Sequence, residues 1–489
     1  MGIMPSRLLG RGARVAASWS AEERDAVLYA AAALFAIVTA QGSSISLYKQ
    51  WGWLAVGPYT GGAVASAVAA RHAKRRAAAV AADGAGIMAS RATPTWHWTT
   101  SRTVIFLVVF VGATLGPLAL EVLWQTDSGG TSHVQPETLV VEGSGSNLAH
   151  GKPLYREIDG RHERISAPAG QPAYDVYNPY LPLMSLFGLP SSTNAPRRLT
   201  DARVVFSLIT ILVVVAALAL CRGPTGPRVL SLQAMTVFPT AALPLATGGD
   251  DLPIAALLLL GLVLLQRRRP LVAGLVLGVA ASMKITAWPL AALALLVATD
   301  KDGNRGRRPA LFFVGGLALV MAPSILPTFF DNPAAFIDNV VRFPLGLAGI
   351  ASPASSPLLG HAIVSWFPGI HRLFTVVVGA VGGAVLLFVL VRHTPRTAAQ
   401  LSRLLGWAMT IAILVAPATR IGYLLYPVDF FIFSWLLRSE DLGSPMRAWD
   451  EPALHEPALH EPVHDEAIIG RGLPPVEEPV GQLSAPQLS

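Results

Sequence analysis

The sequence predicts an all-α protein that crosses a membrane many times. Its 489 residues are 52% hydrophobic and only 14% charged, whereas soluble domains carry about a quarter charged residues. Apolar runs of roughly 20 residues, the length that crosses the hydrocarbon core of a bilayer, recur along the chain. The formal charge of +7 comes from basic residues clustered between those runs, a distribution that indicates membrane anchoring and not nucleic-acid binding.

We expect about 10–12 transmembrane helices, since each apolar run can form one span. The long runs are 26–42, 52–70, 103–123, 202–221, 228–246, 309–327, 372–391 and 421–437, and the shorter ones are 252–266 and 403–418. Residues 1–80 form an N-terminal two-span extension and residues 100–440 the membrane core. The first 24 residues contain no short apolar core with a cleavage site, so no cleaved signal peptide is expected. The single cysteine, Cys221, excludes an intrachain disulfide.

The basic clusters predict how the chain is threaded. They lie at 7–14, 71–76, 222–228, 267–269, 301–308 and 392–403. Because short cytoplasmic loops are rich in Lys and Arg, placing every cluster in the cytoplasm puts the segments 124–201 and 328–371 outside a multi-pass plasma-membrane protein. A single misplaced cluster would change this threading.

Residues 270–299 must cross an even number of times, because a basic cluster stands at each end. The segment is too short for two full crossings at 1.5 Å per residue, so we expect two short or tilted helices with a bend near Lys284 and Pro289. Such a bend is buried in protein or lines a wet cavity, which makes Lys284 a functional candidate. Alternatively, Lys284 extends to the membrane interface.

The C-terminal segment 441–489 is predicted to be a disordered, acidic, proline-rich cytoplasmic tail. It contains the repeat Glu-Pro-Ala-Leu-His at 451–455 and 456–460. Proline every few residues blocks helix formation, and the apolar surface is too small to fold. The repeated histidines could also be interpreted as a metal-binding tract.

The outer loop 124–201 concentrates the polar residues of the chain and contains short helices, and a loop of this length usually has a function. Pro136 begins one short helix that ends near Gly151. Glu137 lies in its first turn, where the helix dipole favours an ionised carboxylate that can act as a general base. Glu142 is the second candidate. The simpler interpretation is an N-terminal helix charge.

Two further segments could contact a substrate. Tyr177 lies in a tract rich in aromatic residues and prolines that returns to the membrane, which is typical of an interfacial belt but could also form one wall of a lipid or sugar groove. Asp250 and Asp251 follow two glycines in a very short outer loop. They could cap the next helix, or bind sugar hydroxyls or a cation. An isolated Asp-Asp pair is weak evidence for a metal site.

In this order, these segments resemble the GT-C type membrane glycosyltransferases, most closely glycosyltransferase family 87, the polyprenol-phosphate-mannose-dependent mannosyltransferases of actinobacteria. The resemblance covers residues 103–440. It depends on the loop acid Glu137, Gly-Lys-Pro-Leu-Tyr at 151–155, Tyr-Asn-Pro at 177–179, Gly-Gly-Asp-Asp at 248–251, and the Ala-Gly…Gly…Lys helix at 273–284. The family usually has aspartate at the loop acid and amide residues in the turn, so Glu137 and the Asp-Asp pair are departures.

The resemblance implies transfer of a hexose, such as mannose, from a polyprenyl-phosphate sugar to a lipid-linked or glycan acceptor at the outer face. Glu137 or Glu142 would deprotonate the acceptor, and Lys284 would offset the charge of the departing phosphate. Asp250, Asp251, Tyr177 and Tyr155 would bind substrate. No metal or other cofactor is required, because the leaving group is already a weakly basic anion. The alternatives are a transporter or flippase of a lipid-linked saccharide and an inert membrane scaffold.

Overall fold

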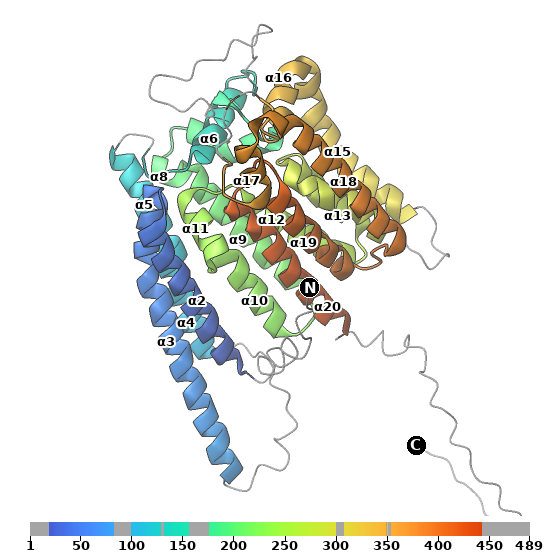
Figure 1. Cartoon of the computed structure of the whole chain (residues 1–489). Coiled ribbons are helices and arrows are strands. Elements are labelled where there is room, and N and C mark those ends of the chain that lie inside the picture. Colours follow the sequence, from blue (N-terminus) through green and yellow to red (C-terminus); the bar gives the residue numbers. More distant parts are fainter. Residues whose placement is uncertain are drawn as a thin grey trace, which may run out of the picture. The chain divides into compact units, whose positions relative to one another are not determined.

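The structure is a computed structural model, and it describes residues 19–82, 99–128, 132–155, 176–299, 308–348, 350 and 354–442 (Figure 1). Every regular element in these ranges is a helix, apart from an isolated parallel bridge between Ser355 and Thr419. The predicted all-α fold is therefore confirmed. Residues 443–489 of the predicted tail lie outside these ranges, as do loop residues 156–175 and the basic residues at 7–14 and 301–307.

Eight helical segments of the described chain are long and apolar enough to cross a membrane. They are α2 (Ala21–Gly42), α4–η3–α5 (Thr100–Phe110, Val111–Leu115 and Gly116–Ser128), α9 (Ala202–Leu220), α10–α11 (Thr225–Thr236 and Pro239–Thr247), α15 (Arg308–Asp331), η9–α18 (Pro368–Ile370 and His371–Arg392), α19 (Ala398–Val415) and η10–α20 (Ile421–Leu424 and Leu425–Leu442). Three shorter apolar segments are α12 (Asp251–Gln266), α13 (Pro270–Ala281) and η7–α14 (Ile285–Ala287 and Trp288–Ala298).

Three of the predicted runs differ from the observed helices. The run 52–70 lies inside α3 (Ser46–Ala82), whose polar and small residues keep it out of the eight apolar candidates. The run 228–246 is interrupted before Pro239, which has no N–H to continue the helix. The helix that corresponds to the run 403–418 spans Ala398–Val415 and so starts five residues earlier. The helix begins at Ala398, where the Thr397 side chain accepts a hydrogen bond from the Gln400 N–H.

Helix α3 is much longer than a bilayer requires. Its 37 residues span about 55 Å, whereas the hydrocarbon core is about 30 Å thick. Figure 1 shows its C-terminal end projecting beyond the neighbouring helices. The residues on this projection are exposed and include Arg71, Lys74, Arg75 and Arg76. The basic cluster at 71–76 therefore lies on the part of α3 that extends beyond the bundle.

The N-terminal helix pair α2–α3 is packed tightly against the core. Asp25 and Arg102, each 3% exposed, form a two-point ion pair at 2.7 and 3.0 Å. The indole of Trp51 donates to the carbonyl of Ala113 at 3.0 Å, and the hydroxyl of Tyr59 donates to that of Val237 at 2.5 Å. Buried polar groups need such partners, so these contacts fix how the pair sits on the core.

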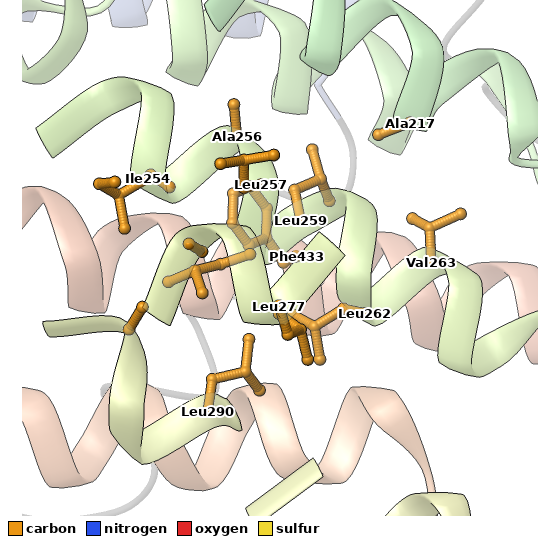
Figure 2. Packing of buried hydrophobic residues seen from close by; sticks show 14 of the residues in the cluster. Ala217, Ile254, Ala256, Leu257, Leu259, Leu262, Val263, Leu277, Leu290 and Phe433 are labelled. Atoms are coloured by element: carbon orange, nitrogen blue, oxygen red, sulfur yellow. The ribbon is translucent and has the colours of Figure 1, made fainter. Parts of the chain in front are cut away.

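Helix α12 lies at the centre of the core. Most of its residues are buried, and the apolar cluster around it includes residues of α9, α13, α14, α19 and α20. Figure 2 shows Leu259 and its neighbours beside Leu277, Leu290 and Phe433. A helix that is apolar on all sides is stable only when protein surrounds it. Both ends of α12 are therefore held in fixed positions by the core.

The short helices that follow α12 confirm the predicted break in residues 270–299. Helix α13 ends at Ala281, and the next helical turn begins at Ile285. Lys284 lies between them with an extended backbone. Helix α13 runs beside α15 at a very close distance, because Gly274 and Gly316 face each other. A Cβ on Gly274 would lie 2.1 Å from the carbonyl oxygen of Phe313.

This packing makes a prediction with a control one residue away. A Cβ on Gly316 would lie 2.4 Å from the Leu271 carbonyl oxygen, whereas one on Gly315 would meet nothing within 4 Å. Gly316→Ala is expected to lower the free energy of unfolding by about 1–3 kcal/mol through overpacking. Gly315→Ala is expected to be neutral, or to raise it by up to about 1 kcal/mol through helix propensity. Thermal unfolding in detergent measures both, and equal effects would contradict the proposed α13–α15 contact.

Candidate active site

Two carboxylates are presented at the N-terminal end of α12. Helix α11 ends at Thr247, and Gly248 follows with φ = 107°, a left-handed conformation that favours glycine. A side chain on Gly248 would also collide with Thr138 Oγ1, 2.0 Å from the added Cβ. The sharp turn places Asp250 and Asp251 at the start of α12, where α6 (Pro136–Ala149) approaches them.

The break after α13 presents Lys284 to the same place. Ending α13 at Ala281 leaves carbonyl groups without helical partners. The tract that returns from the outer loop supplies donors for the two carbonyls that directly follow the helix: the Leu181 N–H binds the Met283 carbonyl and the Leu183 N–H binds that of Ser282, both at 3.0 Å. The break is therefore satisfied by hydrogen bonds within the protein, as irregular backbone in a membrane must be.

Lys284, Asp250 and Asp251 form an ion-paired group, the Lys284 cluster. The Lys284 ammonium is 3.0 and 3.1 Å from the two oxygens of Asp250 and 2.5 Å from Asp251 Oδ1. The side chains of Lys284 and Asp251 are each 13% exposed and that of Asp250 only 3%. Asp250 makes no side-chain cap to α12, and Lys284 is paired within the protein. The structure therefore shows neither Asp250 as a side-chain cap of α12 nor Lys284 extended to the membrane interface.

Aromatic hydroxyls and rings surround the Lys284 cluster. The hydroxyl of Tyr426 donates to Asp251 Oδ1 at 2.7 Å and lies 2.8 Å from Thr286 Oγ1. The Lys284 ammonium lies 5.6 Å from the ring centre of Tyr180 and 6.0 Å from that of Tyr423. Cations are attracted to ring faces at such distances. The cluster is thus held by α20 and by the tract that returns from the outer loop.

Glu137 lies in the first turn of α6, as predicted, and its carboxylate pairs with Arg420. The Glu137 side chain is 16% exposed and that of Arg420 is 32% exposed. Burial, followed by the charges of Asp251 and Glu137, raises the pKa of Asp250 to about 6 against the opposing effect of Lys284. Because Glu137 contributes to this shift, its carboxylate lies within electrostatic range of the Lys284 cluster.

The other predicted site residues have different surroundings. Glu142 accepts from Arg197 at 2.5 Å and from the Ala202 N–H at 3.1 Å, and burial and Asp201 raise its pKa. This carboxylate caps the start of α9. Tyr177 stacks on Phe343 with ring centres 4.7 Å apart. The Tyr155 hydroxyl donates to the carbonyl of Tyr180 at 2.9 Å. Tyr155 thus supports the backbone of a residue that borders the Lys284 cluster.

Arg420 was not identified from the sequence, although a signal for it exists. It lies between α19 and η10–α20, in a connection that the threading places outside. A lone arginine there is contrary to the cytoplasmic bias of basic residues. Burial lowers the pKa of Arg420, but Glu137 and Tyr423 raise it by more, so the guanidinium stays charged. Across the described ranges, no group of three His, Cys, Asp or Glu side chains is arranged to hold a metal ion.

Comparison with known families identifies the core. Residues 179–417, just under half of the chain, match the model of glycosyltransferase family 87. Over these residues the chain is similar to family 87 glycosyltransferases. The match includes Asp250, Asp251 and Lys284 but begins after Glu137 and ends before Arg420. No curated protein and no solved structure matches the chain. Together with the apolar helices, this match supports a membrane glycosyltransferase, as the sequence resemblance predicted.

The Lys284 cluster predicts how this membrane glycosyltransferase responds to the loss of the ammonium. Lys284→Met leaves two carboxylates buried without a cation, and breaking such a group costs about 3–5 kcal/mol. The triple variant Lys284→Met/Asp250→Asn/Asp251→Asn removes the charges together and is expected to recover most of that loss. Thermal unfolding in detergent compares the two, and a single variant as stable as the wild type would contradict the ion pairing.

Proposed function

We propose that this glycosyltransferase transfers a hexose, with mannose the best candidate, from a polyprenyl-phosphate sugar to a lipid-linked or glycan acceptor at the outer face of the plasma membrane. The observation that carries the proposal is the convergence of Glu137, Arg420 and the Lys284 cluster at one end of the buried helix α12. A base, cations and hydroxyl-binding carboxylates are thereby within reach of one substrate.

The charge pattern of the helix ends supports an outer-face site. At the opposite end of α12, Arg267 pairs with Glu440, whose carboxylate also accepts from the Arg222 N–H at 2.9 Å. The basic clusters after α9 and α12 thus lie at the end remote from Asp250. Basic residues concentrate on the cytoplasmic side. The proposed orientation follows, with the Lys284 cluster outside and the tail after α20 in the cytoplasm.

Glu137 is the proposed general base. It takes the proton of the acceptor hydroxyl while the acceptor oxygen bonds to the anomeric carbon, and the bond from that carbon to the phosphate oxygen breaks. The electron pair of the broken bond leaves with the polyprenyl phosphate, and the configuration at the anomeric carbon inverts. The ion pair with Arg420 fixes the orientation of the carboxylate, as a positioned base requires.

The cations differ in how available they are to a phosphate. Lys284 is already shared by two carboxylates, so its cluster contains one more negative than positive group when all three are ionised. Among the described residues, Arg420 pairs with one carboxylate, that of Glu137, and its side chain is more exposed than that of Lys284. Guanidinium groups suit phosphate oxygens because their donors are planar and paired. We assign the departing phosphate chiefly to Arg420, with Lys284 as a second cation. Asp250 and Asp251 accept hydrogen bonds from sugar hydroxyls.

A transporter or flippase of a lipid-linked saccharide is the second candidate, and an inert scaffold is the third. Both would retain a lipid-accessible polar site. Neither would form a covalent product, so transfer of label from a radioactive polyprenyl-phosphate sugar to a new lipid or glycan separates transfer from transport. Movement of the intact donor across vesicles without a new product would favour the flippase.

The assignment of the base can be tested with two carboxylates of one helix. Glu137→Gln keeps the shape but cannot accept the proton, and the turnover number is expected to fall by roughly 10²–10⁴-fold, the usual contribution of general-base catalysis. Glu142→Gln, whose side chain caps α9, is expected to stay within about threefold of wild type, provided that it folds normally. The labelled-transfer assay measures both. A larger loss for Glu142→Gln than for Glu137→Gln would transfer the role to Glu142.

The raised pKa of Asp250 predicts an acid limb in the pH–rate profile. Because this pKa is about 6 rather than the ordinary 3.8, Asp250 takes up a proton as the pH falls through 6. It then no longer accepts hydrogen bonds as an anion, and the transfer rate is expected to fall toward lower pH. In Asp250→Asn this limb should disappear, leaving a lower rate that is nearly constant between pH 5 and pH 7. If Asp250→Asn kept the acid limb, a titrating group other than Asp250 would be its cause.

A further inference from the structure

The outer end of α3 contacts the loop that carries Glu137. Gln50 lies in the second turn of α3, and its Oε1 is 3.1 Å from Nδ1 of His133, four residues before Glu137. The same nitrogen is 3.0 Å from Oε2 of Glu121. Through these two contacts the His133 ring links the N-terminal extension to α5.

His133 has a backbone conformation that needs such support. Its φ is 65°, in the left-handed region that residues other than glycine rarely adopt. Strained residues of this kind persist where the surroundings determine them, and they gather at functional sites. Here the His133 carbonyl also accepts from Arg203 Nη1 at 2.5 Å, and Trp124 lies 5.5 Å from the imidazole between ring centres. Both the ring and the carbonyl of His133 are thus held by contacts.

The segment after His133 leads directly to the proposed base and is tied to the turn before Asp250. The Gln135 N–H binds the Thr247 carbonyl at 3.1 Å, and its Nε2 binds Thr247 Oγ1 at 2.5 Å. Thr138 Oγ1 binds the Gly248 carbonyl at 3.2 Å. Glu137 lies between these two attachments. The turn therefore holds the chain on both sides of Glu137, and the His133 contacts hold the segment that leads into it.

A second residue of α3 lies close to Glu137. Burial, and then the negative charge of Glu137, raises the pKa of Tyr48 to about 12, and Arg420 opposes the shift. The Tyr48 hydroxyl is therefore within electrostatic range of the Glu137–Arg420 pair. This end of α3 therefore contacts the loop through Gln50 and also places Tyr48 within electrostatic range of the proposed base.

We propose that the N-terminal helix pair positions the general base, with Gln50 as a positioning residue that acts through His133 on Glu137. The inference rests on the proposed function and gives the extension a part in it. Gln50 touches neither substrate nor the reacting atoms. It limits the motion of the segment 133–138, so that Glu137 faces the acceptor hydroxyl at the moment of transfer. Small displacements of a catalytic group cause large losses of rate.

The test combines transfer kinetics with hydrogen exchange of the backbone between residues 132 and 141. Gln50→Ala is expected to lower the turnover number about fivefold, the effect of losing one hydrogen bond to a positioned group. The KM values for donor and acceptor should stay within about twofold, because substrate contacts are intact. Exchange in this segment should become faster. Gln50→Glu keeps an acceptor of the same length and is expected to restore both measurements.

Lys49→Ala is the matched control, since Lys49 is adjacent on α3 and exposed. It is expected to behave as wild type in exchange and in turnover. Unchanged exchange in Gln50→Ala would overturn the positioning role, and so would faster exchange with unchanged turnover. Faster exchange in Gln50→Ala of a protein that shows no transfer in its wild-type form would refute the proposed function instead, and would leave the attachment of the loop to α3 intact.

Discussion

The pairing of Lys284 with Asp250 and Asp251 is the interaction on which the site depends. An ammonium within a membrane protein is costly unless it is paired, and a helix can break there only if its freed backbone groups find partners. Both conditions are met at one place. The start of α12 supplies two carboxylates, and the tract at 181–183 supplies two N–H groups. The ion pairs therefore join α12 to the end of α13, and the two hydrogen bonds join the tract from the outer loop to the end of α13.

The same constraint explains why the three central helices are short. Helices α12, α13 and α14 have 16, 12 and 11 residues, too few to cross a bilayer of ordinary thickness. Helix α12 is buried among its neighbours, and α13 and α14 pack against the longer helices α15 and α19, so their ends can lie below the membrane surface while their polar groups are paired within the protein. A polar site at this depth would hold the head of a lipid-linked substrate while its apolar chain stays in the membrane.

Much of the site could be predicted from the sequence, because its signals are local. The break near Lys284 follows from basic clusters at both ends of a short apolar segment, and the position of Glu137 follows from Pro136. The pairings could not be predicted, because they join distant segments. Arg420 is 283 residues from Glu137, and Tyr426 is 175 from Asp251. Capping was an equally good local interpretation of Asp250, and only the tertiary arrangement shows the carboxylate directed at Lys284 instead.

The most direct test is a structure with an intact polyprenyl-phosphate sugar, or a non-hydrolysable analogue, bound to the protein. The donor phosphate is expected within hydrogen-bonding distance of Arg420, with the sugar against Asp250 and Asp251 and its anomeric carbon open to Glu137. A donor bound instead at the opposite end of α12, beside Arg267, would contradict the assignment of the site.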